Sequence, residues 1–142
     1  MYFAGWALTI IPIPYLADRF GRRKIIAISL FINILVILTL LLSNSLNLTI
    51  CAMFFAGMIT SGRLTVAFVY LNEFFMPNQR TFYGTLFILI DGLSYLVMTV
   101  YFSYIGNNYY QVCVLGLIIA IVTFCLFLKY GCESVLWQLK VE

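Results

Sequence analysis

The sequence predicts an all-α integral membrane protein, a five-helix transmembrane bundle. Of its 142 residues 64% are hydrophobic and only 9% are charged, whereas a water-soluble domain carries about 25% charged residues. The apolar residues form five long runs separated by short polar breaks, and the basic residues gather in alternate breaks. Because so short a chain cannot hide this apolar surface in one core, the bilayer is its expected solvent.

The five spans follow from the lengths of the apolar runs, since a helix needs about 20 residues to cross about 30 Å of hydrocarbon. The expected spans are 1–17, 25–42, 48–71, 82–105 and 110–128, followed by a cytoplasmic tail at 129–142, all in a single domain over 1–142. The first run is the shortest, and it lacks the basic start of a signal peptide, so we expect no cleavage. Backbone groups in hydrocarbon must bond internally, and the runs do not alternate as barrel strands do, so helices are expected.

The charged residues separate the two sides of the membrane. Seven of the eight lysines and arginines follow the first, third and fifth runs: Arg19, Arg22, Arg23, Lys24, Arg80, Lys129 and Lys140. The opposite connections, 43–47 and 106–109, carry no charge. The positive-inside rule therefore predicts an outside N-terminus and a cytoplasmic C-terminus.

Composition also excludes several classes of function. The chain has no histidine, and its four cysteines form no CxxC pair, so no metal site and no cofactor is expected. An enzyme is not expected, because the usual basic partner of a catalytic nucleophile is missing. No nucleic-acid partner is expected either, since the basic residues mark a membrane side.

The third run contains a face of small residues, which favours close packing of helix backbones. These residues are Ala56, Gly57, Thr60, Ser61 and Gly62.

The most informative stretch joins the first two runs. It reads Pro14-Tyr15-Leu16-Ala17-Asp18-Arg19-Phe20-Gly21-Arg22-Arg23-Lys24. Gly21 lets the chain reverse without a Cβ penalty, and the cations can meet anionic head groups. Asp18 can pair with these cations or cap the following helix. A simple topogenic loop would carry similar charges, so charge count alone leaves that alternative open.

The order of these residues closely resembles the signature between the second and third helices of the major facilitator superfamily, Gly-x-Leu-Ala-Asp-Arg-x-Gly-Arg-Arg/Lys. The charged and turn residues that match it are Asp18, Arg19, Gly21, Arg22 and Arg23. Pro14 stands where the pattern has its leading glycine.

A second stretch, Glu73 to Thr81, resembles the Glu-x6-Arg loop after the fourth helix in the sugar and organic-ion branches of that family. The resemblance implies that Glu73 and Arg80 join the first loop in a cytoplasmic charge network that holds an inner gate shut. An ordinary solvated loop with two charges is the open alternative. After the last run, Glu133, Ser134 and Trp137 weakly resemble the segment that ends the family's N-terminal half.

Together these matches place the spans at helices two to six of the family, an incomplete N-terminal half, nearest the organic-ion branch. The resemblance implies transport of a small organic solute by alternating access, in a carrier of which this chain is expected to be a fragment. The expected partners are the lipid bilayer, the solute and the missing transporter helices. The alternative is a truncated transporter-like protein that serves as a structural subunit of a larger membrane complex.

Two ionisable residues remain inside the expected spans, Arg63 and Asp91, and a charge left unpaired in lipid costs several kcal/mol. Arg63 lies ten residues before Glu73 and Asp91 eleven residues after Arg80, so both lie about 15 Å deep. We expect an Arg63–Asp91 pair that lines the solute path. The alternative is an ion pair that only fixes helix register.

Overall fold

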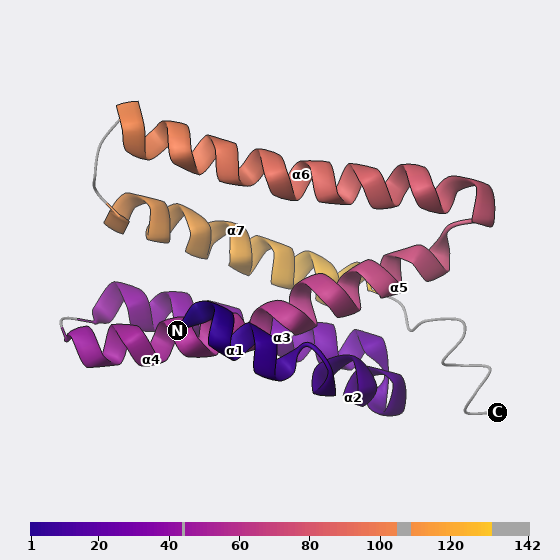
Figure 1. Ribbon diagram of the computed structural model, residues 1–142, viewed down its shortest axis with the longest axis horizontal. Helices are drawn as coiled ribbons and strands as arrows, with labels where there is room; N and C mark the ends of the chain where they lie inside the picture. The colour runs from indigo at the N-terminus through magenta and orange to yellow at the C-terminus, as the bar shows by residue number, and fades with distance from the viewer. Residues whose placement is uncertain (44, 105–108, 132–142) are drawn as a thin grey trace.

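The computed structural model describes residues 1–43, 45–104 and 109–131, and all secondary structure within these residues is helical. The elements are α1 (Tyr2–Thr9), α2 (Pro12–Phe20), α3 (Arg22–Leu42), α4 (Leu46–Thr60), the π-helical segment η1 (Ser61–Val66), α5 (Ala67–Phe74), α6 (Pro77–Tyr104) and α7 (Tyr109–Tyr130). The long helices run side by side along one axis, with α6 outermost on one side (Figure 1). The connection at Gly21 and the start of α6 lie at the same end of the bundle, which we call the basic end.

Four stretches of the described chain are long and apolar enough to cross a membrane. They are Arg22–Leu42, Leu46–Glu73, Gln79–Tyr104 and Tyr109–Tyr130. They fall on the second to fifth of the expected runs, and α4, η1 and α5 together make one continuous span. The protein is therefore a multi-pass integral membrane protein.

The expected five-helix count is not exact, because the first run forms two short helices. α1 ends at Thr9 and α2 begins at Pro12, which occupies the first turn of α2. Pro12 and Pro14 have no N–H to donate to the carbonyls four residues earlier, so a continuous helix loses two hydrogen bonds here. Ile10 and Ile11 nevertheless keep right-handed helical dihedrals. The first run is thus a proline-interrupted helix rather than one regular span.

The close contact between α1 and α4 depends on two glycines that face each other. A Cβ added at Gly57 would overlap the carbonyl oxygen of Tyr2, and one added at Gly5 would overlap the backbone of α4. In the same interface the Thr9 hydroxyl shares its proton between the carbonyl oxygen of Gly5 in its own helix, at 2.9 Å, and that of Met58 in α4, at 3.1 Å. This arrangement confirms the expectation that small residues of the third run permit close backbone approach.

A small apolar core joins α2, α3 and η1. Its buried members are Ala17, Ile26, Leu30 and Val66, and Phe124 and Phe127 of α7 pack against it. Phe31 and Phe124 bring α3 and α7 together, with ring centroids 6.0 Å apart. The core holds the turn between α2 and α3 firmly against the end of the third run.

Helix α6 is attached mainly through its first turns, which pack on α5. Phe75 stacks on Tyr83 with ring centroids 3.8 Å apart, and Phe68 lies 5.8 Å from Phe87. None of the most apolar stretch of α6 is buried, whereas 39% of that stretch is buried in Leu46–Glu73.

Candidate functional site

The turn at the basic end is built on Gly21, the single residue between α2 and α3. Gly21 is buried and has φ of 98° and ψ of 133°, a conformation that residues with a Cβ rarely adopt. This geometry confirms the expected role of Gly21 in reversing the chain. It also places Asp18 of α2 beside Arg22 in the first turn of α3.

Arg22 is the centre of the charge cluster at this end. Its Nη2 and Nε atoms donate to Asp18 Oδ1 at 2.8 and 3.1 Å. Its Nη1 atom forms an ion pair with the Glu73 carboxylate on α5. The Arg22 and Glu73 side chains are only 16% and 10% exposed, whereas Asp18 is 57% exposed. The two motifs therefore meet through Arg22. Of its two acidic partners, Glu73 is the more buried.

The other basic residues of the motifs have separate partners. Arg23 donates from Nη2 to the Leu128 carbonyl near the end of α7 at 3.4 Å, where the helix dipole favours a cation. Arg19 is exposed and lies 5.9 Å from the centroid of the Phe20 ring.

Arg80 lies in the first turn of α6, and its Nε donates to the carbonyl of Phe75 at 3.1 Å rather than to the Arg22 cluster. Glu133, Ser134 and Trp137 lie outside the described residues.

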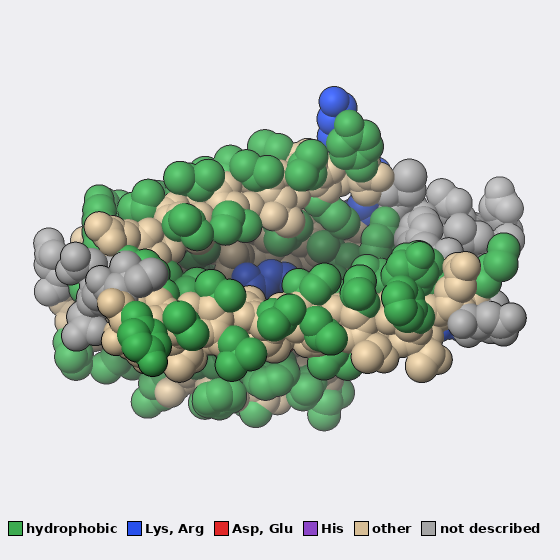
Figure 2. Space-filling model, turned by 90° about the horizontal axis from the view of Figure 1, so that it is seen from above, with side chains coloured by type: hydrophobic (Ala, Val, Ile, Leu, Met, Phe, Trp, Pro, Cys, Tyr) green, Lys and Arg blue, Asp and Glu red, His purple; other side chains and the backbone are tan. Residues whose placement is uncertain are grey.

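A pocket of about 540 Å³ opens between α3, η1, α5 and α7. Its lining residues are Ile26, Leu30, Arg63, Ala67, Tyr70, Leu71, Phe75, Thr123, Phe127 and Tyr130. The space-filling view shows a hollow between apolar rims with basic side-chain surface at its floor (Figure 2). Pockets that hold small molecules span about 300–1,000 Å³ and are mostly apolar with few polar groups, so size and lining suit a small solute.

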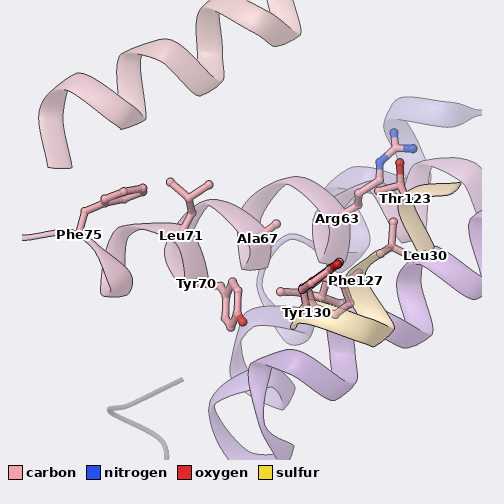
Figure 3. Close-up of a pocket in the computed structure, with 10 residues that line it drawn as sticks. Leu30, Arg63, Ala67, Tyr70, Leu71, Phe75, Thr123, Phe127 and Tyr130 are labelled. Carbon is pink, nitrogen blue, oxygen red and sulfur yellow. The ribbon is translucent and has the colours of Figure 1, made fainter. Parts of the chain in front are cut away.

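Arg63 is placed in this pocket by η1. Its Nη1 atom donates to Asn33 Oδ1 on α3 at 3.2 Å. In Figure 3 the guanidinium lies at the end of the pocket that Thr123 shares, while Phe75 lies at the other end. The Thr123 hydroxyl donates to the carbonyl of Ile119 at 2.8 Å. The Arg63 end of the pocket is therefore polar, and the opposite end is apolar.

The expected ion pair between Arg63 and Asp91 is not formed. Among the described residues, Arg22 forms ion pairs with Asp18 and Glu73, and no ion pair includes Asp91. Arg63 bonds to the neutral Asn33 instead. The physical reason is that Asp91 lies on α6, which packs chiefly on α5.

Sequence reasoning missed Asn33, the hydrogen-bond partner of Arg63, and several residues that line the pocket. Asn33 carried a signal, because an amide in the middle of an apolar helix needs a partner in lipid. Thr123, Phe127 and Tyr130 carried none, because hydroxyls and rings in α7 are equally suited to packing and to interfaces. The π-helical segment was not predicted, although such segments often occur at functional sites.

Membrane-length helices, a charged turn at one end and a pocket between the helices define a polytopic membrane protein with a cavity large enough for a small solute. Residues 1–135 match the family model of the Major Facilitator Superfamily, and the chain belongs to that family. Members of this family are membrane transporters, not enzymes, so the expected bilayer environment and transport class are confirmed. The alternative of a structural subunit is not favoured by the match.

Proposed function

We propose that this protein moves a small organic solute across its membrane by alternating access, with the Arg22 cluster as the cytoplasmic gate. The observation that carries the proposal is the pairing of Arg22 with both Asp18 and Glu73, which links two sequence motifs across α2, α3 and α5. The excess of basic residues supports a cytoplasmic position for this end.

The chemistry of the cluster suits a gate. A mostly buried ion pair loses hydration when it forms, so its attraction and its desolvation cost nearly balance. Water that enters as α5 moves away from the turn would rehydrate both Arg22 and Glu73. Closed and open arrangements can then lie close in free energy, which a transport cycle requires.

The other motif residues surround this centre. Gly21 sets the turn, Arg23 links α3 to α7, and Arg19 and Arg80 extend the basic surface of the gate. Arg63 is assigned to the solute cavity that the gate controls, whereas Asp91 does not line the pocket. In this arrangement the pocket lies next to the gate, on the side toward the membrane interior, because η1 and α5 connect Arg63 to Glu73.

Solute uptake tests the transport activity itself. The full chain, reconstituted in liposomes, is supplied with a panel of isotopically labelled small organic acids, amines and neutral solutes. We expect saturable uptake of at least one solute above protein-free liposomes. Uptake that equals the protein-free level for the whole panel would contradict the proposal.

Cysteine labelling tests the gate without knowledge of the solute. Ala67→Cys provides a thiol in the pocket after Cys51, Cys113, Cys125 and Cys132 are replaced by serine. In the Arg22→Gln background, an impermeant maleimide should label Ala67→Cys several-fold faster from the basic side and more slowly from the opposite side. Lys129→Gln, which removes an exposed charge outside the pocket lining, is the control.

The two directions of labelling separate the possible outcomes. Opposite changes on the two sides support a gate that alternates access. Two outcomes would overturn the assignment of Arg22 to the gate. One is that Ala67→Cys is labelled at equal rates with and without Arg22→Gln, and the other is that the labelling rates rise on both sides, as in a loosened bundle.

A further inference from the structure

We propose that the pocket binds an amphipathic organic anion, a carboxylate or sulfonate with an apolar body, and that Arg63 binds its charged group. This inference rests on the proposed function, because it names the class of solute that the cavity would accept. The site is the 540 Å³ pocket between α3, η1, α5 and α7.

The first argument is charge. Within the described chain, Arg63 is the one charged residue that lines the pocket, and the remaining lining residues are apolar, aromatic or hydroxyl side chains. Its hydrogen-bond partner, Asn33, is a neutral amide and leaves the positive charge uncompensated. Arginine presents a planar fork of N–H donors that matches a carboxylate or sulfonate. An anion would therefore meet a donor without a competing carboxylate in the pocket wall.

The second argument is depth. Arg63 lies ten residues before Glu73 along the same span, which corresponds to about 15 Å, or half of the hydrocarbon thickness. A cation at this depth costs several kcal/mol unless a counter-charge or water accompanies it. Lipid head groups lie at the membrane surfaces, and an anionic solute within the bundle would supply this counter-charge.

The third argument is the shape of the apolar part. Tyr70 and Phe127 meet edge to face with ring centroids 6.2 Å apart, and Phe75 and Tyr130 complete an aromatic wall. Figure 3 shows Arg63 at one end of the pocket and Phe75 at the other. A ligand with its charge at one end and an apolar or aromatic body at the other fits this polarity. Rings alone would also attract a cation, but Arg63 repels one.

Direct binding of three matched compounds tests the inference. The full chain in nanodiscs of phosphatidylcholine, which supply no anionic lipid, is titrated with 4-(4-fluorophenyl)butyrate, its amide and the corresponding primary amine, observed by ¹⁹F NMR. We expect the carboxylate to bind, the amide to bind about tenfold more weakly, as loss of a charge-assisted hydrogen bond implies, and the amine to show no saturable binding.

Variants locate the charge that selects the anion. Arg63→Gln should weaken carboxylate binding about tenfold or more and remove the preference over the amide. Arg63→Lys keeps the charge but loses the fork, so an intermediate affinity is expected. Lys129→Gln removes one exposed charge outside the pocket lining and should bind the carboxylate like the unmodified protein.

The outcomes distinguish this inference from the proposed function. Equal binding of carboxylate and amide, or preferential binding of the amine, overturns the anion site without any variant and leaves transport to the uptake panel. Unchanged carboxylate binding in Arg63→Gln overturns the role of Arg63. Selective anion binding with no uptake of any solute would support the site and overturn transport.

Discussion

The span Leu46–Glu73 and helix α6 have similar mean hydropathy but very different surroundings. In their most apolar stretches 39% of the first and none of the second is buried. The first carries Gly57 and Gly62 at positions where neighbouring helices leave no space for a Cβ, whereas nothing lies within 4 Å of a Cβ added at Gly92 in α6. Apolar side chains gain little by leaving lipid for one another, so small residues and polar links decide which helices pack.

The contrast extends to the polar contacts. The turn between α2 and α3 is tied to α5 by Arg22 and Glu73, and α1 is tied to α4 by Thr9. In α6 the hydroxyls of Thr85 and Thr99 bond to carbonyls four residues earlier in the same helix. Near the end of α6, the Tyr101 hydroxyl donates to Gln111 of α7 at 2.8 Å. Substitutions at the contacts between α1 and α4 and between α3 and α5 should therefore lower the stability of the protein, whereas substitutions at Gly92 or Thr99 of α6 should change it little.

The largest effect is expected at the buried ion pair. Arg22→Gln removes the positive charge of Arg22 from beside the Glu73 carboxylate, which is 10% exposed, and the free energy of unfolding should fall by about 3 kcal/mol. Asp18→Asn removes the exposed partner of the same arginine and should cost less than about 1 kcal/mol. Unfolding of both variants in SDS titrations measures the difference. Equal losses of unfolding free energy in the two variants would show that the pair of Arg22 with Glu73 contributes no more to stability than the pair of Arg22 with Asp18.

The next effect is expected at the glycine contact. Gly57→Val places a side chain against the carbonyl of Tyr2 and should destabilise the bundle by about 1–3 kcal/mol through overpacking. Gly92→Val makes the same chemical change in α6, where the space is open, and should change stability by less than about 0.5 kcal/mol. Thermal unfolding in detergent compares the two. If Gly92→Val lowered the stability as much as Gly57→Val does, the two spans would not differ in packing as described.

The smallest effect is expected at a single hydroxyl. Thr9→Val removes the donor to the Met58 carbonyl, and cross-helix hydrogen bonds in membranes average about 0.6 kcal/mol. Thr99→Val removes a hydroxyl that bonds only within α6, so its effect on unfolding should be close to zero. The same SDS titration measures both. A larger loss in Thr99→Val would mean that α6 has a partner at that position.

Hydropathy predicted the long helices well because the bilayer imposes their length. It could not show that the first run is interrupted, although Pro12 and Pro14 were visible, because proline in a membrane helix can either bend it or break it. The charged turn was predicted as a group of residues, and Gly21 behaves as expected. That Arg22 rather than Arg80 would pair with Glu73 depends on which helices pack, and one sequence does not contain that information.

The same limit applies to the pocket. Arg63 was predicted to lie in a cavity because a lone charge in an apolar run requires an explanation, and it does line one. Its partner was wrongly expected to be Asp91, because equal depth in two helices does not make them neighbours. Asn33 took that place because α3 packs on the π-helical segment.

The π-helical segment Ser61–Val66 also has an evolutionary consequence. A π-turn arises when one residue is inserted into an α-helix, and each α-helical residue turns the chain by about 100°. Deletion of Leu64 would restore a regular helix, but it would rotate the part of the span before Leu64 about the helix axis relative to the part after it. Arg63 could then no longer reach the pocket while Glu73 still reached Arg22. A single additional residue in the helix thus allows Arg63 to reach the pocket and Glu73 to reach Arg22 from the same span.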